Sequence, residues 1–312
     1  MEFGHVQWSD NITFDTMTVV TSGARADGIR LNNWNPQLTA RVVNVTTRGF
    51  SADGVNLGRE RTDGAFTVTE MATILVEQGM GLRSVTSNIS DGIGRIVFSG
   101  SSSITTLGAG SNQGGYAVYA GADPLACGPF GLPLYDCRSS GQAEVILGGS
   151  ANASHVIRTS GDQAYGLYAL GRGYIAANNV SITTTGSEAH GINAVRRMAR
   201  FYHSSAEFGD QDYSGRIGLK GNVTISVGND AQAIRADSFD NITGPRAGLY
   251  LNGNKASILS LTPGRYNING NILSQNFGLI DLTMGNGSIF TGATRAVNGG
   301  DIHLRFNGHQ SI

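Results

Sequence analysis

The stretch "SITTTGSEAHGINAV", residues 181–195, alternates polar and apolar residues on both sides of a short turn that contains glycine. Related phrases occupy residues 19–31 ("VVTSGARADGIRL"), 44–57 ("NVTTRGFSADGVNL"), 156–169 ("VIRTSGDQAYGLYA") and 224–236 ("TISVGNDAQAIRA"). In each copy a glycine stands three residues before a small anchor residue; the anchors are Ala26, Ala52, Ala164, Ala189 and Ala231. Two pairs of anchors are 26 and 25 residues apart, and a third pair is 42 apart. A strand-and-turn unit repeated about every 25 residues indicates a β-solenoid.

In a β-solenoid each repeat forms one coil of short strands, and successive coils pair their strands in parallel. We expect Val, Ile and Leu to point inward, and the repeated glycines to occupy corners that need a positive φ. The whole chain, residues 1–312, then forms one all-β domain of about a dozen coils. A β-sandwich or barrel is the alternative, but those folds rarely repeat one phrase at a fixed spacing.

The composition narrows the possible partners. Charged residues make up 14% of the chain and the net charge is −1, which argues against binding nucleic acid or an anionic membrane through bulk charge. No window is apolar enough for a membrane helix. The first residues lack the features of a signal peptide, so we expect either a cytosolic protein or a mature fragment, and the final "LRFNGHQSI" carries no stop signal, which favours a piece cut from a longer chain.

Two segments interrupt the repeat, near residues 121–140 and 196–213. The first holds Cys127 and Cys137, which are separated by nine residues that include two glycines and two prolines. We predict a disulfide, as found in oxidising compartments, with two free thiols as the alternative. Phe130, Leu132 and Tyr135 of the same loop are expected to form a contact surface or to fold back over the coil beneath.

The second interruption combines arginines with aromatic residues, a pattern that suits sulfate or carboxylate groups on a sugar chain. A short helix that caps a strand edge is the alternative. The candidate ligand-binding residues are Arg196, Arg197, Arg200, Phe201 and Tyr202.

Outward positions of the repeat align in two columns. One is predicted to contain Arg30, Asn56, Tyr168, Asn193 and Arg235, and the other Asp27, Asp53, Tyr165, His190 and Gln232. Columns of polar and aromatic residues along a solenoid make a shallow groove that suits an extended polymer. Of these residues, Tyr168, Asn193 and Arg235 are the candidate ligand contacts, and simple solvation of an outer face is the alternative.

Catalytic signatures are absent from the sequence. No nucleophile elbow, zinc-protease motif, phosphate-binding loop or dinucleotide fingerprint occurs, and the six histidines form no set with metal-ligand spacing. Asp210 and Asp212 are the best local pair of acids, and such a pair on a loop is usually solvated. We therefore expect no enzyme activity, no cofactor and no metal; a polysaccharide-cleaving β-helix would instead need clustered carboxylates.

The repeat phrases "TTTGSEAHGINA" and "RTSGDQAYGLYA", with the run at residues 264–292 ("GRYNINGNILSQNFGLIDLTMGNGSIFTG"), resemble the passenger domains of Gram-negative autotransporters, in the group of pertactin and the AIDA-type adhesins. The resemblance implies a right-handed parallel β-helix exported by type V secretion through a C-terminal β-barrel, which we expect to be missing from this chain. It also implies a location at the outer face of the outer membrane and a role in adhesion and virulence.

Protease members of that family carry a serine motif that this chain lacks, and no RGD tripeptide is present. The implied partners are host extracellular matrix proteins, glycosaminoglycans or other glycans. Self-association between passengers on neighbouring cells, which leads to aggregation and biofilm, is the second hypothesis, and a polysaccharide lyase, hydrolase or tailspike-like depolymerase is the third.

Overall fold

The computed structural model describes residues 2–3, 11–31, 37–58, 64–86, 93–109, 115–122, 142–149, 151–196, 214–238 and 255–308. These residues form β-strands and contain no helix, so none of them belongs to a helix able to cross a membrane. Neighbouring strands run parallel in two sheets of ten and fourteen strands. The predicted all-β parallel solenoid is confirmed.

The ten-stranded sheet takes one strand from each coil, so the described residues make ten successive coils, close to the expected dozen. Its strands are β1 (Glu2–Phe3), β3 (Ile29–Leu31), β5 (Val55–Leu57), β7 (Leu82–Thr86), β10 (Val118–Ala122), β13 (Leu167–Leu170), β15 (Ile192–Val195), β17 (Gln232–Asp237), β20 (Asn271–Gln275) and β23 (Thr294–Val297).

The fourteen-stranded sheet covers the other two sides of the coil. In some coils one long strand bends across both sides, and in the others two shorter strands share them. The long strands are β2 (Asn11–Thr21), β4 (Gln37–Thr47), β6 (Ala65–Val76), β14 (Gly173–Thr184) and β16 (Arg216–Val227). The shorter ones are β8 (Ile93–Phe98), β9 (Ser101–Thr106), β11 (Gln142–Leu147), β12 (His155–Thr159), β18 (Ser257–Ser260), β19 (Tyr266–Asn269), β21 (Leu279–Met284), β22 (Ile289–Thr291) and β24 (Asp301–Phe306).

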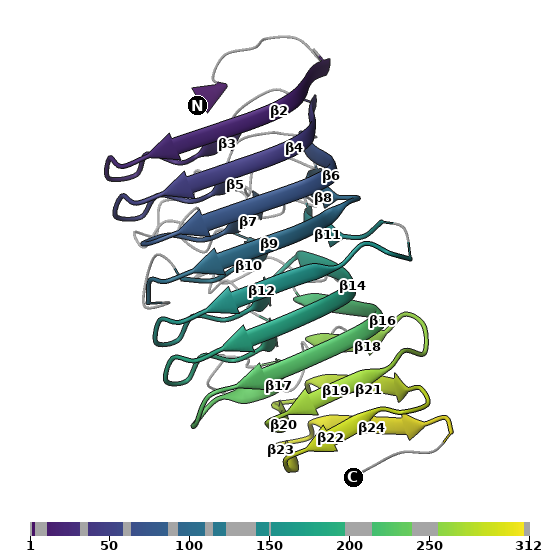
Figure 1. Ribbon diagram of the computed structural model, residues 1–312. Helices are drawn as coiled ribbons and strands as arrows, with labels where there is room; N and C mark the ends of the chain where they lie inside the picture. Colours follow the sequence, from purple (N-terminus) through teal and green to yellow (C-terminus); the bar gives the residue numbers. More distant parts are fainter. Residues whose placement is uncertain are drawn as a thin grey trace, which may run out of the picture.

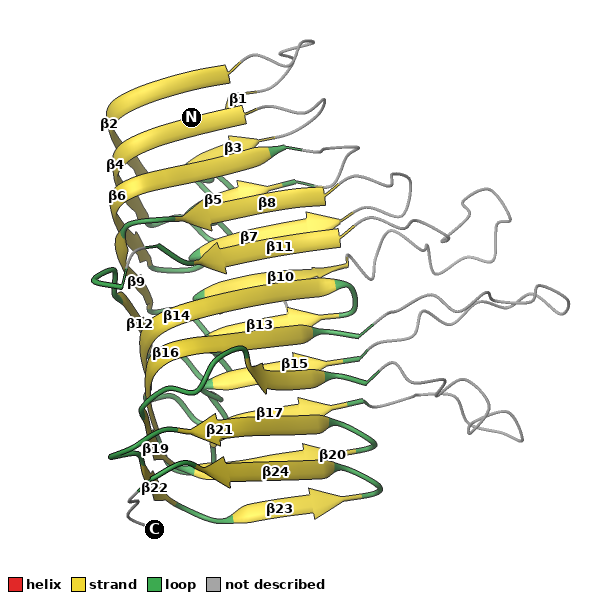
Figure 2. Ribbon diagram, turned by 90° about the vertical axis from the view of Figure 1, so that its right-hand side faces the viewer, coloured by secondary structure: helices red, strands yellow, loops and turns green. Residues whose placement is uncertain are grey.

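Figure 1 shows the coils stacked along one axis from the N terminus to the C terminus. The front strands point left, the return strands lie behind them and the chain descends, so the coil is right-handed. Figure 2 shows the same stack from the side, with the strands of the two sheets running in opposite directions. The molecule is a right-handed parallel β-helix.

Identical side chains stack inside the coil. Ile104, Ile157, Ile182, Ile225 and Ile268 are in register on five successive coils, and each is at most 1% exposed. One inward row of the ten-stranded sheet likewise consists of Ile, Val and Leu, whereas the second inward row changes from Leu to Ser and Ala after Leu57. Because parallel strands lie about 4.8 Å apart, one branched side chain covers the next and water is excluded along the axis.

The repeated corner glycines are required for a reason other than the expected one. Gly49, Gly161 and Gly186 do not have positive φ; that conformation falls on the residue two positions later, as in Ser51 and Glu188. A Cβ on Gly49 would lie 1.8 Å from the carbonyl oxygen of Gly23 on the preceding coil, and one on Gly186 would lie 2.0 Å from that of Gly161. The predicted positive φ was therefore wrong: the constraint is the close stacking of corners.

A buried threonine closes each of these corners. The hydroxyl of Thr47 donates to the carbonyl of Ala52 at 3.0 Å, and that of Thr159 donates to the carbonyl of Ala164 at 2.7 Å. Thr21 and Thr184 make the same contact in their own coils. The carbonyl of the anchor alanine is thus satisfied by the side chain that ends the preceding strand.

Candidate functional site

The first predicted column exists as one continuous row on the outer face of the ten-stranded sheet. Strand register aligns Arg30 with Asn56, Tyr168 with Asn193, and Asn193 with Arg235. Between Asn56 and Tyr168 the register adds Arg83 and Tyr119, which sequence reasoning missed. We call the row the outer column: Arg30, Asn56, Arg83, Tyr119, Tyr168, Asn193 and Arg235.

Two members of the outer column are not open to solvent, contrary to expectation. Asn56 is 7% exposed and Asn193 is 1% exposed, although both lie on the outer face. Each short asparagine stands in register between longer side chains, Arg30 and Arg83 for Asn56, and Tyr168 and Arg235 for Asn193. The candidate contact Asn193 is therefore a spacer between larger neighbours rather than an open surface group.

The second predicted column lies three residues earlier on each coil, where the turn enters the sheet, and we call it the turn column. It contains Asp27, Asp53, Met80, Tyr116, Tyr165, His190 and Gln232; Met80 and Tyr116 were missed from the sequence. Three of its side chains, Asp27, Asp53 and His190, accept a hydrogen bond from the backbone N–H at the same position of the next coil. Asp53 N–H donates to Asp27 Oδ1 at 2.8 Å, and Gln232 N–H donates to His190 Nδ1 at 3.0 Å.

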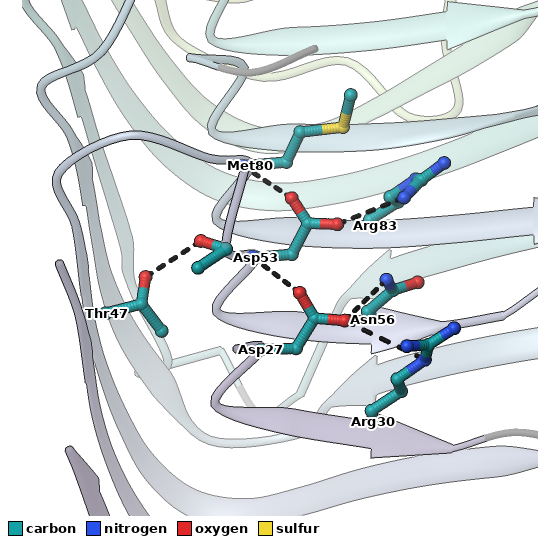
Figure 3. A network of polar contacts seen from close by, with 8 residues as sticks. Asp27, Arg30, Thr47, Asp53, Asn56, Met80 and Arg83 are labelled. Carbon is teal, nitrogen blue, oxygen red and sulfur yellow. Dashed lines mark hydrogen bonds and ion pairs between the residues drawn. The ribbon is translucent and has the colours of Figure 1, made fainter. Parts of the chain in front are cut away.

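Asp27 and Asp53 are consecutive acids of the turn column (Figure 3). Asp27 Oδ2 accepts from Asn56 Nδ2 at 2.8 Å, Asp53 Oδ1 accepts from the backbone N–H of Met80 at 2.9 Å, and Asp53 Oδ2 accepts from Arg83 Nη1 at 3.2 Å. The Asp53 side chain is 4% exposed. Burial raises the pKa of Asp53 to about 6, with Arg83 opposing this shift and Asp27 adding to it.

Four tyrosines and a histidine from three coils gather on this face, and we call them the tyrosine cluster: Tyr116, Tyr119, Tyr165, Tyr168 and His190. The ring of Tyr165 stacks on the imidazole of His190, with centroids 4.9 Å apart and planes 6° apart, and on the ring of Tyr116 at 5.1 Å. Tyr168 meets Tyr116, Tyr119 and Tyr165 edge to face. The rings of Tyr116, Tyr165 and Tyr168 are half-buried, so each keeps part of its surface in solvent.

The tyrosine cluster packs on a small apolar layer outside the main core. Met80, Val85, Tyr119 and Leu170 are buried together there, and Tyr116, Tyr168 and Val195 lie against them. Burial raises the pKa of Tyr116 to about 12, and burial also raises the pKa of Tyr165. The phenols therefore stay protonated at neutral pH and present hydroxyl groups.

The cluster is bordered by cations at both ends. At one end Arg83 is in register with Tyr119 and pairs with Asp53. At the other end Arg235 Nη1 lies 3.4 Å from His190 Nε2, and Arg235 Nη2 lies 2.8 Å from Asp237 Oδ2. Burial and then the charge of Arg235 lower the pKa of His190 to about 4, so the imidazole is neutral at neutral pH. The site is a shallow aromatic platform between two guanidinium groups.

Most of the predicted loop contacts lie outside the described residues: Cys127, Phe130, Leu132, Tyr135 and Cys137 of the first inserted segment, and Arg197, Arg200, Phe201 and Tyr202 of the second. Arg196 is described, and it is 4% exposed. It forms an antiparallel bridge with Ser214, and its N–H donates to the carbonyl of Asp237. Arg196 is thus a buried residue at the edge of the coil. Its predicted role as an exposed ligand contact is not supported.

Ser102 and His155 form a buried pair of residue types that also occur in catalytic sites, but the pair is not accessible to a substrate. His155 Nδ1 lies 2.9 Å from Ser102 Oγ, and His155 Nε2 lies 2.9 Å from the carbonyl of Gly148. The carbonyl can only accept, so His155 carries its proton on Nε2 and Ser102 donates to Nδ1. His155 is 0% exposed and burial lowers its pKa, which makes this pair a structural link between β9 and β12. Within the described part of the chain, no group of three or more acidic, histidine or cysteine side chains could hold a metal ion.

Comparison of the chain with protein-family models, with characterised proteins and with solved structures finds no match. The fold and the tyrosine cluster are therefore inferred from the residues of this chain alone, without support from a related protein.

Proposed function

We propose that this protein is a non-enzymatic adhesin of the autotransporter passenger type, displayed at the surface of a Gram-negative cell, which binds host glycans or extracellular matrix. Two features support the proposal: the right-handed parallel β-helix and the repeat phrases that resemble such passengers. The observation that carries the binding function is the tyrosine cluster between Arg83 and Arg235.

The chemistry of the cluster suits an extended sugar chain. Half-buried tyrosine rings offer flat apolar faces to the C–H faces of sugar rings, and their hydroxyl groups donate to sugar oxygens. The side chains of Arg83 and Arg235 are 27% and 23% exposed, so they can also contact carboxylate or sulfate groups. Because neighbouring coils are about 4.8 Å apart, rings from three coils cover the length of roughly two sugar residues.

The test is binding of the purified chain to an array of glycosaminoglycans, neutral glycans and matrix proteins over a range of salt concentrations. We expect binding that falls at least tenfold in the double variant Tyr165→Ala/Tyr168→Ala and persists in Phe50→Ala, a matched control because Phe50 is an aromatic residue that is 61% exposed elsewhere. No binding to the array, together with dimers that form as concentration rises, would replace this proposal by self-association.

Polysaccharide cleavage is a second candidate because two acids lie side by side and burial raises the pKa of Asp53 to about 6. A raised pKa is the property of a general acid in glycoside hydrolysis. However, each oxygen of Asp27 and Asp53 already accepts a hydrogen bond, and both side chains are at most 5% exposed. Shortening of array polysaccharides by the wild-type chain, abolished in Asp53→Asn, would establish cleavage in place of adhesion.

A further inference from the structure

The outer face of the fourteen-stranded sheet has a hollow of its own, separate from the tyrosine cluster. It has a volume of about 360 Å³ and lies over β11, β14, β16 and β18; three of these strands, β11, β14 and β16, face the viewer in Figure 2. Its lining includes Gln142, Glu144, Tyr174, Arg216, Gly218, Leu259 and Leu261. The volume is at the small end of the roughly 300–1,000 Å³ typical of small-molecule sites.

Small residues interrupt one outward row beside the hollow. Register aligns Ile146 with Ala176, Ala176 with Gly218, and Gly218 with Leu259, so two of four neighbouring positions carry a methyl group or nothing. The Leu261 side chain fills the space above Gly218, because a Cβ there would lie 2.8 Å from Leu261 Cδ1, and Leu261 is itself 50% exposed. The floor and one wall of the hollow are therefore apolar.

The opposite wall of the hollow is polar and is formed by the neighbouring row of outward-facing residues on the same sheet. Register aligns Arg95, Glu144, Tyr174 and Arg216 on four successive coils. Arg95 Nε donates to Glu144 Oε2 at 2.6 Å, and the Glu144 side chain is 12% exposed. Burial and then the charge of Glu144 raise the pKa of Tyr174, while Arg216 opposes the shift, so the phenol lies within the fields of both charges and remains a hydrogen-bond donor.

We propose that this hollow binds one neutral sugar residue in its pyranose form. A pyranose has an apolar C–H face for Tyr174, Leu259 and Leu261, and it has hydroxyl groups that both donate and accept. Glu144 accepts from such hydroxyls while Arg216 and the Tyr174 phenol donate to them. Arg95 pairs with Glu144 and balances its charge, and the mixed donors and acceptors of the rim match the hydroxyl groups of a neutral sugar.

This site does not depend on the proposed role of the tyrosine cluster, which lies on the other sheet. The experiment is saturation-transfer NMR and titration of the purified chain with the methyl pyranosides of glucose, galactose, mannose and N-acetylglucosamine. We expect millimolar binding of at least one of them, weakened at least tenfold by Tyr174→Ala and by Gly218→Val, whose side chain would displace Leu261 from its place in the wall of the hollow. Lys220→Ala, two residues further along β16 and exposed, is the matched control and should bind normally.

Circular dichroism of each variant establishes that the coil is intact. If Gly218→Val fails to fold, Leu261→Ala replaces it, because this exposed wall residue can be shortened without disturbing the core. The proposal is overturned if none of the four pyranosides binds, if binding is unchanged in Tyr174→Ala, or if glucuronate or glucosamine binds as well as the neutral sugars. Loss of array binding in the tyrosine-cluster variants with retained pyranoside binding here would separate the two sites.

Discussion

Replacing Asp53 by asparagine should change how the stability of the coil depends on pH. Asp53 is buried in the turn column, where its carboxylate accepts from the backbone of Met80 and from Arg83 (Figure 3). Loss of hydration is the largest influence on this group and raises its pKa from 3.8 to about 6 in the folded protein. The ionised form is therefore less favourable in the folded chain than in the unfolded chain.

The sign and size follow from proton linkage. A difference of about two between the folded and unfolded pKa values corresponds to about 3 kcal/mol. At pH values below the pKa of the unfolded state, Asp53 is protonated in both the folded and the unfolded chain, so it does not change the free energy of unfolding. As pH rises from about 4 to about 6 the unfolded state ionises first, so the free energy of unfolding falls by about 3 kcal/mol and then stays level. The asparagine side chain does not ionise, so the variant lacks this decrease.

The measurement is urea unfolding followed by far-UV circular dichroism for the wild type and Asp53→Asn, from about pH 3 to about pH 8. The difference between the two unfolding free energies should move by about 3 kcal/mol in favour of the variant across pH 4–6. Titration of His155 and His190, whose lowered pKa values make stability fall as pH decreases, cancels in this difference. Asp162→Asn, on an exposed turn, controls for removing an aspartate. A difference that is constant with pH would refute the argument from burial.

Three further measurements test the corners and the cluster. Gly49→Ala should lower the free energy of unfolding by about 3 kcal/mol or more, because the added Cβ would meet the Gly23 carbonyl. Gly23→Ala is the control and should be tolerated, because its nearest contact would be at 3.4 Å. Equal effects of the two substitutions would contradict the crowding of stacked corners. Thr159→Val should lower the free energy of unfolding by about 1–3 kcal/mol, because it leaves the buried Ala164 carbonyl unpaired. Thr183→Val, at an exposed position, is the control and should have little effect; thermal unfolding of the two variants measures the difference. NMR titration should find His190 neutral down to about pH 4, with its pKa rising in Arg235→Ala. A wild-type pKa near 6.5 would count against the burial of His190 beside Arg235.

The alignment of the columns was predictable from the repeat phrases, because a coil of nearly constant length brings equivalent positions into register. Tyr168, Asn193 and Arg235 were placed correctly for this reason. Arg83 and Met80 were missed because their coil, "GMGLRSV", lacks the alanine anchor that marks the other copies. Tyr116 and Tyr119 belong to the weaker phrase "GGYAVYA", whose tyrosine spacing of three matches that of Tyr165 and Tyr168 and was the available signal.

The sequence by itself determined the class of fold and the inward and outward sides of each strand, since both follow from local alternation and a repeated spacing. Only the tertiary structure decided which outward residues remain accessible, because accessibility depends on the side chains of the coils above and below. Asn193 is buried between Tyr168 and Arg235 for this reason. The tyrosine cluster and the hollow beside Gly218 have the same origin: each joins residues from coils that lie 25 or more positions apart in the chain but about 4.8 Å apart in space.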